Sequence, residues 1–136
     1  MKIMSLNMWS GRLERVLQKH LEDSGLDFAC MQEAVDYDGK SLGLISSYQK
    51  VGQILGLQEQ FFSKLISTKL GDKELAFGNV VYSNVPFVQT STVFTRGEYK
   101  NDFNFDEDDY NIRAFQHVQI VINGKKLNLL NHLGII

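Results

Sequence analysis

The sequence has few of the features that mark secreted, disulfide-bonded or membrane-spanning proteins. Its 136 residues include one cysteine, Cys30, and one proline, Pro86. A single cysteine excludes an internal disulfide, and no apolar run approaches the roughly 18 residues of a membrane-spanning helix. The N-terminus also lacks the charged segment and apolar stretch of a signal peptide. We therefore expect a cytoplasmic protein without a membrane span.

An excess of charge of one sign is also missing. The chain has 14 basic and 16 acidic residues, for a formal net charge of -2. This balance excludes a strongly basic nucleic-acid-binding module, but it permits a phosphate-bearing substrate if a metal ion or a local basic group supplies positive charge. Hydrophobic residues make up 43% of the chain, enough for the core of one domain. Cys30 has apolar neighbours and is interpreted as a small buried hydrophobe rather than a nucleophile.

The first part of the chain has the pattern of a βαβ unit. Residues 2–7 and 26–31 are short apolar runs, which predict buried strands. Between them, residues 10–25 place leucine and valine at helical spacing, with a capping serine at the start and a glycine at the end. The strands of a βαβ unit are parallel, so their carboxyl ends share one edge of the sheet. Asn7 and Glu33 are therefore expected to meet at that edge.

The rest of the chain reads mainly as β-structure. A weaker helical pattern covers residues 41–55, and an irregular acidic segment, residues 100–109, is interpreted as a solvated loop. Asn123-Gly124 is a strong signal for a two-residue hairpin, and Pro86 separates two strands. The strands predicted here are residues 60–68, 77–83, 85–95, 114–122 and 125–131.

Four polar residues at strand ends are candidates for a functional site: Asn7, Glu33, Arg113 and His132. A carboxylate with a nearby amide can begin a site for Mg²⁺, an arginine can hold a phosphate through two hydrogen bonds, and a histidine can transfer a proton near neutral pH. Each also has a simpler explanation as a turn residue, a surface charge or a structural histidine. The spacing alone supports only an α/β domain.

Several segments together resemble the endonuclease/exonuclease/phosphatase superfamily, whose members include deoxyribonucleases, abasic-site endonucleases, neutral sphingomyelinases and inositol-polyphosphate 5-phosphatases. The segments are MKIMSLNMW, LDFACMQEA, FGNVVYSNVPF and NIRAFQHVQIVINGKKLNLLNHLG. They run from residue 1 to the end of the chain in the order that the superfamily has. The strand end Asn131-His132-Leu133 has one residue fewer between Asn and His than the superfamily pattern.

The resemblance implies a role for each matching residue. Glu33 is similar to the superfamily's metal-binding glutamate, and Asn7 to the asparagine that positions the metal and the phosphate. Arg113 is similar to the arginine that contacts the scissile phosphate, and His132 to the histidine that binds the phosphate or assists proton transfer. Asn79 either contacts substrate phosphate or holds a loop. The implied chemistry is hydrolysis of a phosphate ester (nucleic acid, phospholipid or inositol phosphate) with Mg²⁺ or Mn²⁺.

Two motifs of the superfamily are missing from their expected places. A Gly-Asp-x-Asn and a later Ser-Asp-His, which holds the general base, normally follow the histidine strand, but four residues follow His132 here. The triplet Asp102-Phe103-Asn104 has the residue types of part of the first motif. It comes before Arg113, whereas the superfamily places the motif after that arginine, and it lies in the acidic segment, so the loop interpretation is preferred.

Residues 1–136 are therefore expected to be the N-terminal half of a four-layer α/β sandwich, a mixed β-sheet with flanking helices. We expect this half to be mostly one sheet whose apolar inner face is exposed. The chain would then pair with another copy, bind a missing second half, or be a truncation of a longer reading frame, and a homodimer through the exposed face is the favoured alternative. We also expect the chain alone to be inactive as a phosphoesterase or nuclease. The alternative is a non-catalytic remnant or interaction module that keeps only the sheet scaffold.

Overall fold

The computed structural model describes residues 1–13, 16, 18–19, 25–37, 41–43 and 45–133. The helix predicted over residues 10–25 lies largely outside this part of the chain, although Val16, Gln18 and Lys19 are helical. The elements are β1 (Ile3–Asn7), β2 (Phe28–Asp36), β3 (Ser41–Leu42), β4 (Ile45–Ser46), α2 (Tyr48–Leu55), β5 (Glu59–Leu70), β6 (Lys73–Ser83), β7 (Gln89–Arg96), β8 (Arg113–Ile122) and β9 (Lys125–Asn131).

A four-stranded sheet carries the N-terminal part of the chain, in the order β1-β2-β6-β5. The strands β1 and β2 pair in parallel, with Asn7 opposite Gln32, as the βαβ pattern predicts. The other two pairings are antiparallel, so the sheet is mixed. The carboxyl ends of β1 and β2 thus lie together at one edge, where the sequence placed its first candidate residues.

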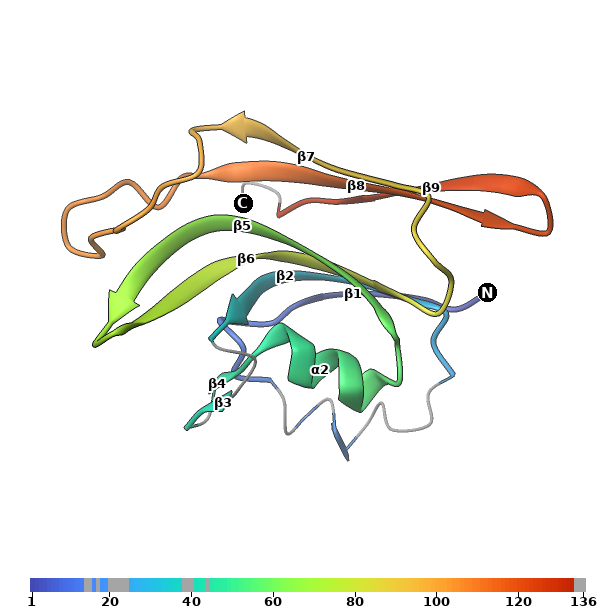
Figure 1. Cartoon of the computed structure of the whole chain (residues 1–136), viewed down its shortest axis with the longest axis horizontal. Helices are drawn as coiled ribbons and strands as arrows, with labels where there is room; N and C mark the ends of the chain where they lie inside the picture. Colours follow the sequence, from blue (N-terminus) through green and yellow to red (C-terminus); the bar gives the residue numbers. More distant parts are fainter. Residues whose placement is uncertain (14–15, 17, 20–24, 38–40, 44, 134–136) are drawn as a thin grey trace.

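A second sheet packs against the inner face of the first. The strands β7, β8 and β9 form this three-stranded antiparallel sheet, and Figure 1 shows it lying over β6, β2 and β1. Asn123 and Gly124 both have positive φ, as the predicted two-residue hairpin between β8 and β9 requires. The apolar side chains between the sheets are Phe28, Cys30, Val81, Val118, Ile120 and Leu129.

The expectation of mostly one sheet with an exposed inner face is therefore wrong. The strands after Pro86 pair with one another instead of extending the first sheet, and they bury that face within the same chain. The expected homodimer was to bury this apolar face. Because the second sheet of the same chain already buries it, that driving force for dimerisation is absent.

A short helix covers the opposite face of the four-stranded sheet (Figure 1). The helix α2 is shorter than the predicted range of residues 41–55, because Ser41–Leu42 and Ile45–Ser46 pair as the strands β3 and β4 instead. Ser47 begins the helix by accepting a hydrogen bond from the Lys50 N–H, and Gly56 ends it with a left-handed φ of 68°. None of the described helices is long and apolar enough to cross a membrane.

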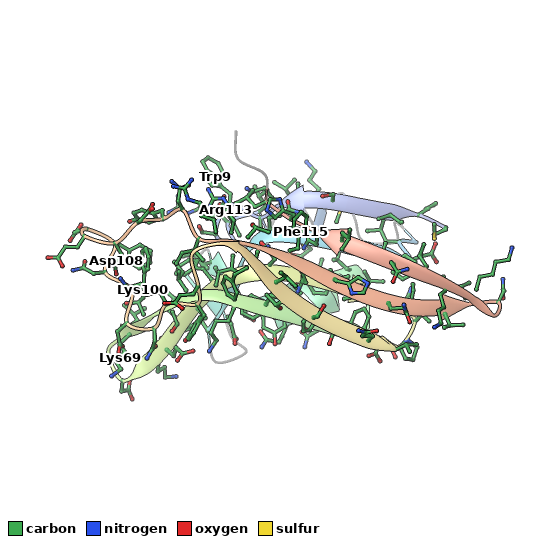
Figure 2. The ribbon with its side chains drawn as sticks, turned by 90° about the horizontal axis from the view of Figure 1, so that it is seen from above. Trp9, Lys69, Lys100, Asp108, Arg113 and Phe115 are labelled. Atoms are coloured by element: carbon green, nitrogen blue, oxygen red, sulfur yellow. The ribbon has the colours of Figure 1, made fainter. Side chains whose placement is uncertain are left out.

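The segment between β7 and β8, residues 97–112, is anchored to β5 rather than wholly solvated. The Phe103 side chain is 2% exposed, and its N–H donates to the Ser67 carbonyl over 2.8 Å. The Ser67 N–H in turn donates to the Lys100 carbonyl over 3.0 Å. The solvated-loop interpretation is therefore wrong for the centre of this segment, which Figure 2 shows beside the β5–β6 hairpin.

Candidate functional site

A β-bulge presents Glu33 at the edge of the four-stranded sheet. The register of β2 against β6 shifts between Met31 and Ala34, and Glu33 has a φ of 53°. A positive φ is uncommon for a residue with a side chain, and a bulge re-aims the side chain that it carries. The strand pattern of the sequence located Glu33, but it gave no sign of this bulge.

Asn7 meets Glu33, as the parallel arrangement of β1 and β2 predicts. The Asn7 Nδ2 donates to Glu33 Oε1 over 2.9 Å, and its Oδ1 accepts from the Trp9 N–H over 2.8 Å. Both ends of the amide are thus engaged, so Asn7 fixes one oxygen of the carboxylate. Within the described part of the chain, the other Glu33 oxygen has no protein donor.

Gly78 and Asn79 form the floor beside Glu33. A Cβ on Gly78 would lie 1.9 Å from the Ser63 carbonyl oxygen, so only glycine allows β5 to approach this closely. Asn79 is 1% exposed; its Nδ2 donates to the Ala114 carbonyl over 3.4 Å, and its Oδ1 is buried without a partner. Contact of Nδ2 with a phosphate, the predicted role, would require this amide to turn.

Arg113 begins β8 on the other sheet and reaches the same place. Its Nη1 donates to the carbonyls of Tyr110, over 3.1 Å, and Ile112, over 3.0 Å. These two bonds hold the guanidinium in one orientation. Its Nε is buried and has no partner. Figure 2 labels Arg113 at the place where β8 begins.

His132 lies beside this group of residues. Its ring stacks on Phe115, with centroids 4.2 Å apart, and its Nε2 is buried without a partner. The next residue, Leu133, lines the cavity described below, whereas His132 does not.

One cavity of about 310 Å³ joins most of the predicted residues. Its polar part is lined by Glu33, Asn79, Arg113 and Ser10. Its apolar part is lined by Leu65, Ile66, Phe77, Phe105, Tyr110, Ile112 and Leu133. The structure thus brings three predicted residues to one cavity, holds Asn7 against the carboxylate of one of them, and leaves His132 at the border.

A buried network of amides lies between the sheets directly behind the cavity. The Gln32 Nε2 donates to Asn131 Oδ1 over 2.7 Å, and the Asn131 Nδ2 donates to Gln116 Oε1 over 3.1 Å and to the Met31 carbonyl over 2.9 Å. The Gln116 Nε2 donates to the carbonyls of Phe61, over 2.5 Å, and Asn79, over 3.2 Å. The network ties β2, β6 and β5 to β8 and β9.

This network was not predicted from the sequence. Its members are amide side chains within strands, and two of the three immediately precede a candidate site residue: Gln32 precedes Glu33, and Asn131 precedes His132. A glutamine or asparagine at an inward position of a strand was the available signal, because a buried amide requires partners.

The capacity of the site for a metal ion depends on Glu33. The described residues include no group of three or more His, Cys, Asp or Glu side chains that could hold a metal ion. Mg²⁺ does not need such a group, because it is often bound by one or two carboxylates together with waters and substrate phosphate oxygens. The single carboxylate, with one oxygen fixed by Asn7 and the other open, fits that kind of site.

Cys30 is not part of the site. Its side chain is buried between the two sheets, and this burial raises the pKa of the thiol. A raised pKa disfavours the reactive thiolate, so the interpretation as a buried hydrophobe is confirmed.

Comparison with known proteins identifies the fold. No protein-family model matches the chain, and no curated protein sequence matches it. An endonuclease/exonuclease/phosphatase from Beutenbergia cavernae has a similar structure, with a TM-score of 0.62 and 14% identity, over 96% of this chain and 37% of that protein. A protein of the same family from Leptotrichia buccalis has a TM-score of 0.57 and 14% identity, over 96% of this chain and 52% of that protein. Truncated TDP2 from Caenorhabditis elegans has a TM-score of 0.55 and 16% identity, over 96% and 44%.

The chain therefore has the fold of part of the endonuclease/exonuclease/phosphatase proteins, as the sequence resemblance predicted. It spans between 37% and 52% of the length of these three neighbours.

Proposed function

We propose that this chain carries the metal- and phosphate-binding part of a divalent-metal-dependent hydrolase of phosphate esters. The observation that carries the proposal is that Glu33 and Arg113 line one cavity and that each has a polar atom without a hydrogen-bond partner among the described residues, a carboxylate oxygen of Glu33 and Nε of Arg113. The structure describes no ion pair between these two opposite charges, although both line the same cavity. Two charged groups that are positioned but unpaired are typical of a site that a ligand completes.

Arg113 is the proposed phosphate ligand. Because its Nη1 is held by two backbone carbonyls, the edge formed by Nε and Nη2 is left for an anion. That edge matches two oxygens of a phosphate group. A buried N–H without a partner costs free energy, and a phosphate oxygen would remove this cost.

Glu33 is the proposed ligand for Mg²⁺ or Mn²⁺, with Asn7 orienting its carboxylate. Such a cation, when bound, stabilises negative charge on the phosphate and lowers the pKa of its bound water. The unpartnered Asn79 Oδ1 is an acceptor, so it suits the O–H of a water molecule or of a sugar better than a bare phosphate oxygen. His132 is proposed to hydrogen-bond the phosphate through its unpartnered Nε2, which requires the ring to turn toward the cavity, because His132 does not line it.

We further propose that the chain alone turns over slowly or not at all. In the part of the chain that the structure describes, no histidine is paired with a carboxylate beside the cavity, so a general base is lacking. Phosphate binding that depends on the metal is therefore the more direct test.

The experiment is an NMR titration of the chain with inorganic phosphate, with and without Mg²⁺. We expect phosphate to bind more tightly by at least about tenfold when Mg²⁺ is present, and we expect Glu33→Gln to abolish that increase. Arg113→Lys keeps the positive charge but removes the bidentate hydrogen bonding of the guanidinium, so it should weaken phosphate binding both with and without Mg²⁺. Glu59→Gln, a carboxylate on β5 outside the cavity, is the matched control and should bind as the unaltered chain does.

A companion assay measures hydrolysis of bis(p-nitrophenyl) phosphate with Mn²⁺ by the same four proteins. Turnover that disappears in Glu33→Gln would show that the site is complete, and the proposal of slow or absent turnover would be abandoned. Phosphate binding that ignores both Mg²⁺ and Glu33 would instead remove the proposed hydrolase site and favour a non-catalytic module.

A further inference from the structure

The apolar half of the cavity is walled by aromatic rings that come mainly from the segment between β7 and β8. Phe105 and Tyr110 line the cavity from this segment, and Phe77 lines it from β6. Phe105 is 40% exposed and Tyr110 is 57% exposed. Large apolar side chains that remain exposed beside a polar site suggest that a ligand covers them.

The rings are held in place before any ligand arrives. Phe103 anchors the segment in the core, and its ring meets Phe105 and Tyr110 edge to face, with centroids 5.2 Å and 5.3 Å away. Phe105 packs in the same way on Phe77 at 5.8 Å. The Tyr110 O–H donates to the Phe105 carbonyl over 2.5 Å, which ties the two exposed rings together. Aromatic walls fixed in this way lose little entropy on binding.

The charge of the segment indicates which kind of group it takes. Residues 100–109 contain five acidic residues and one lysine. Such a surface repels a polyanionic inositol phosphate or an anionic membrane, whereas it tolerates a neutral ring that carries N–H groups. Nucleobases are flat, neutral and able to stack on aromatic side chains.

We propose that this aromatic wall is a subsite for an unstacked nucleobase whose attached phosphate lies at Arg113. The substrate class is then a mononucleotide, because the acidic surface that repels an inositol polyphosphate also repels the successive phosphates of a nucleic acid strand. The inference rests on the phosphate site proposed above, and it adds the substrate class. A base within a duplex cannot reach the wall, because its faces are already covered by its neighbours.

The test compares ligands that differ only in the base. The unaltered chain is titrated by NMR, in Mg²⁺, with adenosine 5′-monophosphate, ribose 5-phosphate and adenosine. We expect the nucleotide to bind about tenfold more tightly than ribose 5-phosphate, the size of one stacking contact. Phe105→Leu and Tyr110→Leu together should bring that ratio close to one. Tyr110→Leu keeps the backbone carbonyl that Arg113 uses.

A control variant removes a ring that is equally exposed but lies outside the cavity. Tyr99 is 41% exposed, belongs to the same segment, and does not line the cavity. Tyr99→Leu should therefore leave the tenfold ratio unchanged.

The possible outcomes separate this inference from the phosphate site. Equal affinities for the nucleotide and for ribose 5-phosphate, both lowered by Arg113→Lys, would overturn the base subsite and leave the phosphate site intact. Adenosine that binds as tightly as the nucleotide, with no effect of Arg113→Lys, would remove the phosphate site and keep the base subsite. An unaltered chain that binds none of the three ligands would overturn both.

Discussion

Glu33 holds a backbone conformation that a side chain disfavours, with its φ of 53° in the middle of β2. A left-handed conformation costs roughly 1–2 kcal/mol in a residue other than glycine, and asparagine and aspartate bear it more easily than glutamate does. Strain of this kind persists where the surrounding structure enforces it, often at functional sites.

The strain predicts an unusual ranking of variants at this position. Glu33→Gly should unfold with a free energy about 1 kcal/mol higher than Glu33→Ala, because glycine adopts positive φ without cost. Urea denaturation followed by circular dichroism measures the difference.

Ala34, the next residue of β2, is the control for this ranking because it does not have a positive φ. Ala34→Gly should lower stability, since glycine only adds conformational freedom there. A Glu33→Gly variant that is less stable than Glu33→Ala would contradict the assignment of strain.

At this scale, the sequence predicted which residues meet but not how they are held. Asn7 and Glu33 could be brought together from the parallel strands of a βαβ unit alone. The bulge at Glu33 could not be predicted, because it depends on the register of β2 against a strand more than forty residues later. The unpartnered Nε of Arg113 was hidden for the same kind of reason, since the carbonyls that orient the guanidinium belong to an irregular segment.

At the scale of the elements, the segment between β7 and β8 combines features that are rarely found together. It is irregular and acidic, yet it holds two exposed rings beside the site. Lys100 and Asp108 form an ion pair within it, and Asp108 also accepts from the Asn104 N–H over 2.7 Å. The hydrogen bond from Lys100 and the one from Asn104 hold the pKa of Asp108 below its ordinary value of 3.8.

This lowered pKa sets the direction of a pH effect on the segment. A carboxyl group whose pKa is lower in the folded state stabilises that state above its unfolded pKa, and the contribution is lost as the pH falls through the folded pKa. We expect the segment to keep its order from neutral pH down to about pH 4 and to loosen below it. The ¹³C chemical shift of the Asp108 carboxyl group measures the titration directly.

Lys100→Met provides the control, because it keeps most of the side chain's length and removes its charge. The midpoint for Asp108 should then rise toward 3.8. An unaltered chain in which Asp108 already titrates at its ordinary value would show that the ion pair does not act on the segment.

The strands were the elements that the sequence predicted best. Residues 125–131 match β9 at both ends, and the Asn123-Gly124 turn lies where expected. The β3–β4 hairpin was taken for helix because its four strand residues are too few for a period of two to be recognised. The anchoring of residues 97–112 was missed because an acidic composition masks the one buried ring, Phe103.

For the molecule as a whole, the buried amides join the two sheets. Gln116 is fully buried and bonds to groups on β5, β6 and β9. Its replacement by methionine keeps the volume but leaves the Phe61 and Asn79 carbonyls without this donor. We expect Gln116→Met to lower the free energy of unfolding by about 2–3 kcal/mol, in a single transition that reports on both sheets.

Gln119 offers a comparison on the same strand. It is partly exposed, and its Nε2 donates to Asn128 over 3.1 Å. Because water can replace that bond, Gln119→Met should change stability by less than about 1 kcal/mol. Equal effects of the two substitutions in urea denaturation would show that the network does not contribute beyond ordinary surface contacts.

The pairing of the sheets could not be predicted from periodicity. An alternating pattern identifies a strand and its buried face, but it does not say which strand lies beside it. The strands predicted over residues 85–95, 114–122 and 125–131 correspond to β7, β8 and β9, but they form a second sheet instead of extending the first. The solved neighbours, which have the same fold over part of their length, have it at 14% sequence identity.

The amide of Asn131 also imposes an order of events on the growing chain. Its hydrogen bond to the Met31 carbonyl joins residues 100 positions apart, whereas the β5–β6 and β8–β9 hairpins close between near neighbours in the sequence. Contacts between distant residues form late, because the entropy cost of closing a long loop comes before the contacts can stabilise the chain. On the ribosome, the β5–β6 hairpin can form as it emerges, but Glu33 and Arg113 cannot be brought to one cavity until β8, which carries Arg113, has been made. The site is therefore among the last features of this chain to be folded.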